Sequence, residues 1–323
     1  MIDGIIYDGA GNIKQQTEHF GDGSYTTYQY DTENLHNWSQ NHLHYNSSGQ
    51  HDIGVSFMDD GSRTEFQYDV NNTQAWSVQQ AHFDTQGRND FTVQQYDGGD
   101  RTEFRYDVNN VFVWNQQHNH FDAQNRNDLT REYADNGERT DYYTDVAGLN
   151  VWNARHMHFT VDGRNDYSVD FNDNGSRTEY RNDIHNQYEW SSYNTIHRAD
   201  GRFEQGIAYL DNGQTYKEVY DLDSQHAWKF HTFQYSDQGK LMMSSLLFDN
   251  GVSHINIYDY LNTSSLEYTN YYFNKYGQNT VNSLVYDNGR VEGRGPGLPS
   301  DMQPPSGTNP EPFFYRKPAY IWL

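Results

Sequence analysis

The sequence contains no cysteine, and proline is absent before Pro296. The lack of cysteine excludes disulfides and thiol nucleophiles. No apolar run approaches the roughly 20 residues that a membrane-spanning helix needs, so we expect no membrane insertion. The first residues, Met1 to Gly4, do not form a signal peptide. We therefore expect that export uses another route, or that the chain is a piece of a longer protein.

Basic and hydrophobic residues are also scarce. The chain has 22 Lys and Arg against 45 Asp and Glu, a net charge of -23, and only 34% hydrophobic residues. Its mean hydropathy is -1.07 and its isoelectric point is about 4.8. This balance argues against nucleic acid as a partner, because phosphate binding needs a basic footprint. With 28 Tyr and 7 Trp, the composition favours a thin, half-solvated architecture over a thick core.

What the sequence does contain is a 38-residue repeat, which is clearest from Gly61 to Arg101. Residues 1–24 form a partial N-terminal repeat and residues 25–290 form seven full repeats. Residues 291–323 form a linker rich in proline and glycine, followed by an aromatic tail. The full repeats follow one another without insertion and begin at Tyr25, Arg63, Arg101, Arg139, Arg177, Thr215 and Ser253.

Three turns punctuate each repeat. The first carries Asp-Gly or Asn-Gly, as at Asp60-Gly61, and predicts a type I′ hairpin. The second carries a glycine series in which Asn125 is the one exception, which predicts a backbone with φ > 0 at that position. The third begins with an aspartate, such as Asp69, that we expect to cap its own backbone. Three turns predict three strands, for example Arg63–Tyr68, Ala75–Phe83 and Asn89–Tyr96.

The fold class predicted from this pattern is all-β. An odd number of strands reverses the direction of each successive repeat in an antiparallel meander, so we expect an extended meander or a spiral sheet. The alternative is a solenoid with one repeat per coil, which would stack the tryptophans about one strand spacing apart.

Two short motifs carry a family resemblance. Residues 7–13, YDGAGNI, resemble the YD repeat of the Rhs family, and residues 83–88, FDTQGR, are similar with Phe in place of Tyr. The 38-residue unit with its central Trp is similar to tandem repeats of large secreted bacterial proteins. The resemblance implies long β-sheets that spiral or enclose, with surface or toxin-delivery roles. The chain lacks the Rhs core ending that marks self-cleavage and a toxin cargo.

Histidine pairs are the most suggestive candidate site. A His-x-His pattern places two imidazoles on one face of a strand, where they can bind zinc or copper with a third ligand from a neighbouring strand. The alternative is that histidine fills a half-exposed repeat position. The candidate metal ligands are His42, His44, His118, His120, His156 and His158.

Tryptophan recurs once per repeat, and its position in front of the histidines predicts a shared Trp–His face. The series forms either the packing of the sheet or a stripe that binds carbohydrate. The aspartate-rich turns are ordinary turn chemistry or weak Ca²⁺ sites, so Ca²⁺ or a transition metal is the cofactor class that we consider. The candidate ligand stripe consists of Trp38, Trp76, Trp114, Trp152, Trp190 and Trp228.

No catalytic motif is apparent. The sequence has no HExxH, GxSxG or phosphate loop, and an active site would be a local break in the pattern, which we do not find in the repeats. We therefore expect a non-enzymatic secreted or cell-surface scaffold for adhesion or assembly, with a protein or glycan partner. The alternative is a carbohydrate- or metal-binding module that uses the Trp/His face.

The C-terminal tail is the strongest aperiodic feature. We expect it to dock on the chain's own repeats, where it would cover the exposed last strand, or on a partner. The aromatic residues expected to make these contacts are Phe313, Phe314, Tyr315, Tyr320 and Trp322.

Overall fold

The structure, a computed structural model, describes residues 1–294. The expected tail contacts of Phe313, Phe314, Tyr315, Tyr320 and Trp322 lie outside the described residues. All regular elements in the described part are β-strands. Within the same range, no helix of the length and apolarity needed to cross a bilayer is present.

The chain divides into two compact units, Met1–Arg202 and Phe203–Leu323. Unit 1 contains β1 (Ile2–Tyr7), β2 (Ile13–His19), β3 (Tyr25–Tyr30), β4 (Trp38–Tyr45), β5 (His51–Met58), β6 (Arg63–Tyr68), β7 (Trp76–Phe83), β8 (Asn89–Tyr96), β9 (Arg101–Tyr106), β10 (Trp114–Phe121), β11 (Asn127–Ala134), β12 (Arg139–Thr144), β13 (Trp152–Phe159), β14 (Asn165–Asn172), β15 (Arg177–Asn182) and β16 (Trp190–His197). Unit 2 contains β17 (Phe203–Leu210), β18 (Thr215–Tyr220), β19 (Trp228–Tyr235), β20 (Leu241–Phe248), β21 (Ser253–Tyr258), β22 (Leu266–Phe273), β23 (Asn279–Tyr286) and β24 (Val291–Arg294).

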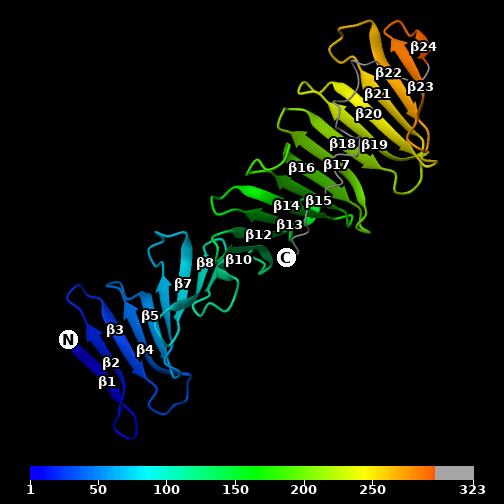
Figure 1. Ribbon diagram of the computed structural model, residues 1–323. Helices are drawn as coiled ribbons and strands as arrows, with labels where there is room; N and C mark the ends of the chain where they lie inside the picture. Colours follow the sequence, from blue (N-terminus) through cyan, green and yellow to red (C-terminus); the bar gives the residue numbers. More distant parts are fainter. Residues whose placement is uncertain (295–323) are drawn as a thin grey trace. The chain divides into compact units, whose positions relative to one another are not determined.

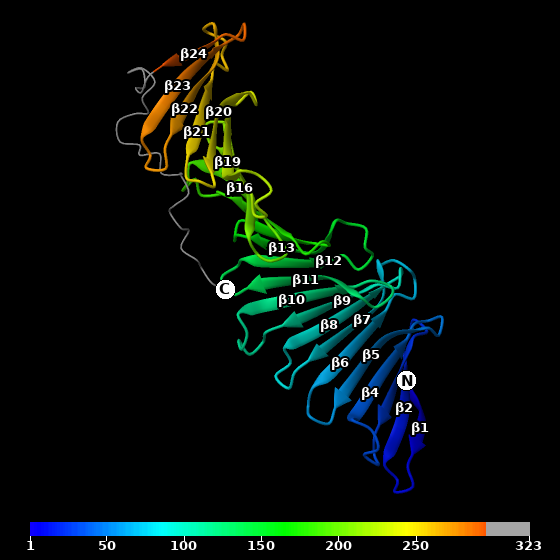
Figure 2. The same ribbon diagram turned by 90° about the vertical axis from the view of Figure 1, so that its right-hand side faces the viewer.

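Each unit is an open antiparallel meander of a single layer (Figures 1 and 2). Within a unit, every described strand contacts only the strands that precede and follow it in the sequence. The expected meander is therefore the arrangement that forms. The solenoid alternative describes neither unit, because the tryptophan-bearing strands β4, β7 and β10 lie three strands apart rather than side by side.

The strands predicted for one repeat match the structure. Two of the three, Arg63–Tyr68 and Asn89–Tyr96, have the predicted bounds, and the middle strand begins at Trp76, one residue later than predicted. The positive φ expected for the second glycine series is also confirmed, with 77° at Gly87 and 64° at Asn125.

The prediction of type I′ hairpins is wrong. At Asp60-Gly61 only the glycine has a positive φ, of 89°, whereas a type I′ turn needs a positive φ at both central residues. The amide of Gly61 donates to the carbonyl of Met58, and the amide of Met58 donates to the carbonyl of Ser62. This pattern is a three-residue loop, a type I turn followed by a left-handed glycine. The Asp60 carboxylate completes it by accepting the amide of Ser62 at 2.9 Å.

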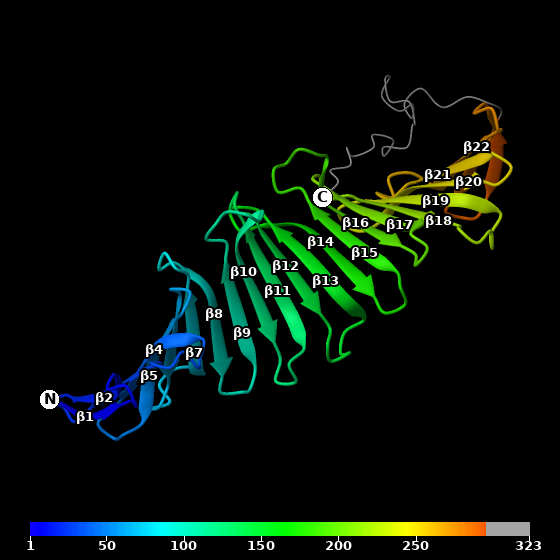
Figure 3. The same ribbon diagram turned by 90° about the horizontal axis from the view of Figure 1, so that it is seen from below.

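Figure 3 shows strands of unit 1, such as β9 to β15, side by side in one sheet, and their register determines which residues share a face. Residues directly opposite each other in an antiparallel pair lie on the same face. The pairings can therefore be followed across the sheet as an unbroken row, which we call row 1. Row 1 runs through Gln16, Tyr28, His42, Val55, Glu65, Ala81, Thr92, Phe104, His118, Arg131, Asp141, Met157, Ser168, Tyr180 and Asn194.

Row 1 shows that residues at the same position of successive repeats lie on alternate faces of the sheet. It passes through His118 and then through Met157, which lies 39 residues later, so the equivalent of His118, His156, lies on the opposite face. After two repeats the original face returns, because His42 and His118 both belong to row 1.

Side chains pack within each face rather than between layers. Most of the buried residues of row 1 have short side chains, for example Ala81, Thr92 and Ser168. Among the described residues the buried hydrophobic set is small, consisting of Ala81, Val169, Ala208, Tyr271 and Val285. The thin, half-solvated architecture expected from the composition is confirmed.

Candidate functional sites along the faces and edges of the sheet

The two histidines of each His-x-His pair have different environments. The first is packed between aromatic rings of both neighbouring strands, as His118 is between Phe104 at 4.6 Å and Tyr133 at 5.1 Å between ring centroids. His156 lies in the same way between Tyr142 and Phe171 on the opposite face. Burial lowers the pKa of both histidines. We infer that the first histidine is a packing residue.

The second histidine pairs with an aspartate eight residues later, across the hairpin. The Nδ1 atom of His44 lies 2.5 Å from Asp52 Oδ1, and His158 Nδ1 lies 2.6 Å from Asp166 Oδ1. His82 pairs with Asp90 and His120 with Asp128 in the same way. These four pairs are half-buried.

A second carboxylate approaches the same imidazole in two repeats. His120 Nε2 lies 3.2 Å from Asp100, and His158 Nε2 lies 3.5 Å from Glu138. Desolvation of His120 opposes its charged form, but hydrogen bonds to Asp128 and Asp100 outweigh it and raise the pKa of His120. We call these four histidines with their aspartates the His–Asp pairs.

The His–Asp pairs were not predicted from the sequence, although the repeats contain a signal for them. Histidine is replaced by Ile196, Gln234 and Tyr272 in the last three repeats. The aspartate is lost from the same repeats, where it becomes Glu204, Met242 and Thr280. This joint loss within one chain indicates that the two residues contact each other.

The structure does not bring the proposed metal ligands together. His42, His44, His118 and His120 lie on one face of unit 1, and His156 and His158 lie on the other. In the described part of the chain, no group of three or more His, Cys, Asp or Glu side chains is placed to hold a metal ion. The second histidine of each pair instead uses its Nδ1 atom to contact a carboxylate.

The expected shared Trp–His face is also wrong. A register shift, as between Trp152 and Ala154, interrupts the alternation of faces after five tryptophans of the series: Trp38, Trp76, Trp114, Trp152 and Trp228. The guanidinium of Arg155 consequently lies over the Trp152 ring, 5.0 Å from its centroid, while the next residue, His156, points to the opposite face.

Four of the six tryptophans of the series stack on the residue two positions before them, at the end of the aspartate-capped loop. The ring centroids of Phe112 and Trp114 are 4.7 Å apart with an interplanar angle of 4°. The Asp107 carboxylate accepts the amide of Phe112 at 2.7 Å and so holds the loop closed. The expected capping by the aspartate series is confirmed. The stacked pairs are His36–Trp38, Phe112–Trp114, Tyr188–Trp190 and His226–Trp228.

Three of these pairs lie along one edge of unit 1. β4, β10 and β16 follow one another at intervals of six strands, so they run in the same direction. The loops that precede them therefore all leave the sheet at the same end of the strands, and we call each such end an edge of the sheet. Six strand spacings amount to roughly 29 Å. We call these loops the aromatic loops: residues 31–38, 107–114 and 183–190. The loops of the alternate repeats, 69–76 and 145–152, lie at the other edge and have Gln74 and Asn150 at the stacking position.

The aromatic loops also expose apolar side chains. Val111 is 74% exposed and Val113 is 84% exposed, and Phe112 between them is 56% exposed. Leu35 and Tyr188 are exposed at the other two aromatic loops. On the opposite edge, Leu149 and Val151 are exposed without an aromatic residue between them.

A local break in the repeat pattern lies on the face that carries row 1. Arg131 replaces the valine found at Val55, Val93 and Val169, and its guanidinium binds the Asp141 carboxylate at 2.8 and 2.9 Å. The side chain of Asp141 is 1% exposed. Hydrogen bonding to Asp141 raises the pKa of Arg131.

A second aperiodic ion pair lies nearby on the same face. The Arg155 guanidinium binds Asp170 at 2.5 and 2.7 Å. It also lines a shallow pocket of about 400 Å³ with Asn165, Tyr180, Ser192 and Asn194. No such break was expected from the sequence. Its signal is the simultaneous appearance of Arg131 and Arg155 at positions that are uncharged in the neighbouring repeats.

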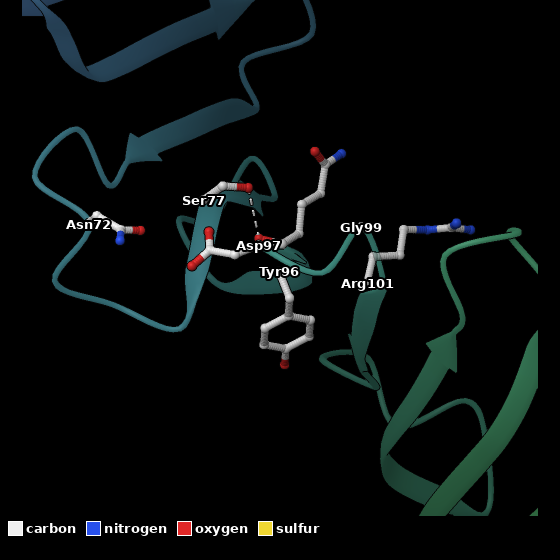
Figure 4. Close-up of a pocket in the computed structure, with 7 residues that line it drawn as sticks. Asn72, Ser77, Tyr96, Asp97, Gly99 and Arg101 are labelled. Carbon is white, nitrogen blue, oxygen red and sulfur yellow. Dashed lines mark hydrogen bonds between the residues drawn. The ribbon is translucent and has the colours of Figure 1, made fainter.

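Another shallow pocket, of about 610 Å³, lies between the loop that contains Asn72 and the hairpin from Tyr96 to Arg101 (Figure 4). In other repeats a backbone hydrogen bond joins the hairpin to the loop, as from the amide of Asp135 to the carbonyl of Val113. The corresponding bond from Asp97 is absent among the described residues. In the next repeat, the side chain of Asn136 accepts a hydrogen bond from the amide of Glu138. Gly98 holds the equivalent position and has no side chain that could do the same. The guanidinium of Arg101 is occupied by Glu103 and the Phe121 ring.

Comparisons with known proteins do not place the chain in a family. The sequence matches no protein-family model and shows no significant similarity to a curated protein. A structure of the eukaryotic initiation factor aligns over 86% of this chain and 89% of its own, with 7% identity and a TM-score of 0.17. Sqt1 of Saccharomyces cerevisiae aligns over 88% and 94%, with 8% identity and a TM-score of 0.14. The β-propeller domain of Cps50 (Swd1) of Myceliophteria thermophila aligns over 78% and 94%, with 9% identity and a TM-score of 0.13. At these TM-scores the three structures carry no argument about fold or function, and the all-β antiparallel architecture rests on the strand pairings alone.

Proposed function

We propose that this chain is a non-enzymatic repeat scaffold of a secreted or cell-surface protein, and that it serves adhesion or assembly by binding a protein partner at several places at once. The observation that carries the proposal is the set of three aromatic loops at one edge of unit 1. Each loop exposes apolar or aromatic side chains held by an aspartate cap, and each returns to the same edge after two repeats.

Periodic loops favour multivalent binding. Rigid aromatic side chains are enriched at the centres of protein interfaces. A partner that engages one loop finds the next at a fixed spacing of roughly 29 Å, so the later contacts form at high effective concentration. The net charge of -23 keeps so extended an apolar edge soluble and favours a partner with basic residues around an apolar centre.

The test is a retention assay with beads that carry the full chain, flowed over a panel of immobilised extracellular proteins and glycans. Changing Val111, Phe112 and Val113 to serine removes one aromatic loop. Further variants also change Leu35 and His36, and then Tyr188. We expect retention on a protein surface to fall more than tenfold as the second and third loops are removed, because avidity is lost.

The matched control changes Leu149 and Val151 to serine on the opposite edge, where equally exposed residues are removed. This control is expected to retain full binding. Retention on no protein surface, or equal loss in the control, would show that the aromatic loops are not a binding edge.

A carbohydrate is the second candidate ligand, favoured by the pocket beside Arg155. Its lining of amides, hydroxyls and a tyrosine ring suits a sugar, which presents hydroxyls at its edge and an apolar face. Glycan-array binding that disappears in Asn194→Ala and Ser192→Ala, and persists when the aromatic loops are changed, would support this candidate over the first.

A further inference from the structure

One hairpin of unit 1, residues 97–100, lacks the backbone contact that other hairpins make with the loop beside them. In five repeats the amide of the first hairpin residue donates to the carbonyl of the residue just before the tryptophan position. These bonds start at Asp59, Asp135, Asp173, Asp249 and Asp287. The equivalent pair at this hairpin is Asp97 and Ala75, and no backbone hydrogen bond joins them in the described part of the chain.

Gly98 gives this hairpin a different support. In another repeat Asn174 holds the same position, and its side chain accepts the amide of Ser176 at 2.9 Å. Here the Asp100 carboxylate takes up the corresponding space, because its Oδ1 atom lies 2.9 Å from where a Cβ atom on residue 98 would be. Its Oδ2 atom lies 3.2 Å from His120 Nε2 on β10. The hairpin is therefore held on the side of β10 rather than on the side of the neighbouring loop.

The opening between the hairpin and the loop is the pocket of about 610 Å³ that Figure 4 shows. Its lining is mainly polar and includes Asn72, Ser77 and Asp97. Figure 4 shows the Asp97 carboxylate turned towards the side on which Asn72 lies, whereas the Arg101 side chain points away from Asn72. Both Asn72 and Asp97 are exposed, so their side chains are accessible to a ligand that enters the pocket.

The missing contact leaves a backbone donor on one side of the opening and a backbone acceptor on the other. The donor is the amide of Asp97 and the acceptor is the carbonyl of Ala75. A secondary amide offers the matching acceptor and donor within one planar group. The Asp97 carboxylate and the Asn72 carboxamide add partners for hydroxyl groups. A sugar that carries an acetamido group combines both kinds of chemistry.

We propose that this pocket binds a neutral N-acetylated amino sugar through its acetamido group. The acetamido carbonyl accepts the amide of Asp97, and the acetamido N–H donates to the carbonyl of Ala75. The ligand thus replaces a contact that other repeats make within the chain. The sugar hydroxyls bind the Asp97 carboxylate and the Asn72 carboxamide. The ligand is neutral because this carboxylate and the net charge of -23 repel an acidic sugar.

The inference goes beyond the proposed function. This pocket lies at the edge of unit 1 opposite the aromatic loops, and it is separate from the pocket beside Arg155, which lies on a face of the sheet.

Titration of the isotope-labelled full chain with N-acetylglucosamine, followed by NMR, tests the proposal. A monosaccharide makes few contacts in a shallow pocket, so we expect a dissociation constant of about 1 mM. The amide signals of Asp97 and Gly99 should shift during the titration. Glucose has a hydroxyl in place of the acetamido group and should bind at least fivefold more weakly.

The double variant Gly98→Asn, Asp100→Ser gives this hairpin the sequence of residues 173–176, where the backbone contact forms. We expect the same contact to form from Asp97 and to close the pocket. Hydrogen exchange of the Asp97 amide should then slow by about tenfold, and the affinity for N-acetylglucosamine should fall by about tenfold. Asn72→Gly removes one carboxamide without backbone strain, since φ is 53° there, and should weaken binding about threefold.

The matched control is Asn174→Asp, in a hairpin of the same edge. It introduces the residue that Asp60 provides in an equivalent hairpin, and it should leave sugar binding unchanged.

Four results would overturn the proposal. The first is an Asp97 amide signal that does not move at about 20 mM N-acetylglucosamine. The second is equal binding of glucose. The third is undiminished sugar binding by a double variant whose Asp97 amide exchanges slowly. The fourth is tighter binding of N-acetylglycine N-methylamide than of the sugar, which would indicate a peptide site. Changes in the aromatic loops, or at Ser192 and Asn194, leave these readouts unaltered, so the proposals fail separately.

Discussion

The Nδ1 atom of His120 lies 2.5 Å from the Oδ1 atom of Asp128, on the opposite strand of a hairpin. Two residues earlier in the same strand, His118 lies on the same face with no hydrogen-bond partner for its buried Nε2 atom. The carboxylates raise the pKa of His120 against the effect of burial, while burial lowers the pKa of His118. The pKa values of the two histidines of this motif are therefore shifted in opposite directions.

The first prediction concerns His120. A raised pKa means that its stabilising contribution is complete below the unfolded pKa of about 6.5 and is lost as pH rises through the folded pKa. His120→Gln should cost about 0.5 kcal/mol at pH 5.5 and almost nothing at pH 9, since partly exposed ion pairs contribute little. Urea unfolding at the two pH values measures the difference. A cost that is equal at both would contradict the assignment.

His118 should behave in the opposite way. Its lowered pKa means that the unfolded chain takes up a proton before the folded chain does, so stability falls as pH decreases through about 6.5. His118→Leu, which keeps an apolar residue between Phe104 and Tyr133, should make the protein less sensitive to acid over pH 7 to 5. The slope of unfolding free energy against pH provides the measurement, and an unchanged slope would disprove the prediction.

A third prediction concerns the buried carboxylate of Asp141. Asp141→Asn leaves the guanidinium of Arg131 without its charged partner and should cost about 2 to 3 kcal/mol. Glu103 holds the same repeat position and is 15% exposed, so Glu103→Gln is the matched control and should cost less than about 1 kcal/mol. Chemical denaturation of both variants decides the question. Equal costs would mean that Asp141 is not a buried ion-pair partner.

The turn glycines give a fourth prediction. Gly163 has a φ of 80°, and a Cβ atom there would meet no atom within 4 Å. Gly163→Val should therefore destabilise the chain by about 1 to 2 kcal/mol through backbone strain alone. Gly163→Asn should cost much less, because Asn125 already occupies the equivalent position. Thermal unfolding separates the two variants, and similar melting temperatures would exclude backbone strain as the cause.

The fifth prediction concerns the cap of an aromatic loop. Desolvation acts in the opposite direction, but hydrogen bonds from the amides of Val111 and Phe112 lower the pKa of Asp107. Its contribution is therefore present above the unfolded pKa of about 4 and is lost as pH falls through the folded pKa. Asp107→Ala should lower the melting temperature by a few degrees at pH 7 and leave it unchanged near pH 2. A shift that persists at pH 2 would contradict the role of the carboxylate.

Much of the fold could be predicted because each repeat marks its turns with characteristic residues. Aspartate and glycine determine where turns occur, and the strands from Arg63 to Tyr96 follow almost to the residue. The hairpin type could not be read from Asp60-Gly61 alone, since the same dipeptide serves a two-residue and a three-residue loop. The backbone hydrogen bond from the amide of Met58 to the carbonyl of Ser62 decides between them, because it leaves three residues in the loop.

The candidate sites were harder to predict because they depend on register. The spacing of Trp152 and His156 predicts a shared face only if the strand alternates without interruption. The bulge after Trp152 breaks that alternation, and nothing in the spacing reveals it. The His–Asp pairs, by contrast, could have been found from their joint loss in the last three repeats.

Because equivalent residues alternate between the two faces, adding or removing an odd number of repeats has a different effect from adding or removing an even number. Inserting or deleting one 38-residue repeat in unit 1 would leave the contacts within the retained repeats in place, and yet it would transfer the later aromatic loops of this unit to the other edge and its later histidines to the other face. Changing the length by two repeats would preserve both. Shortening or lengthening that keeps the aromatic loops at one edge should therefore proceed in steps of 76 residues, as an even number of repeats.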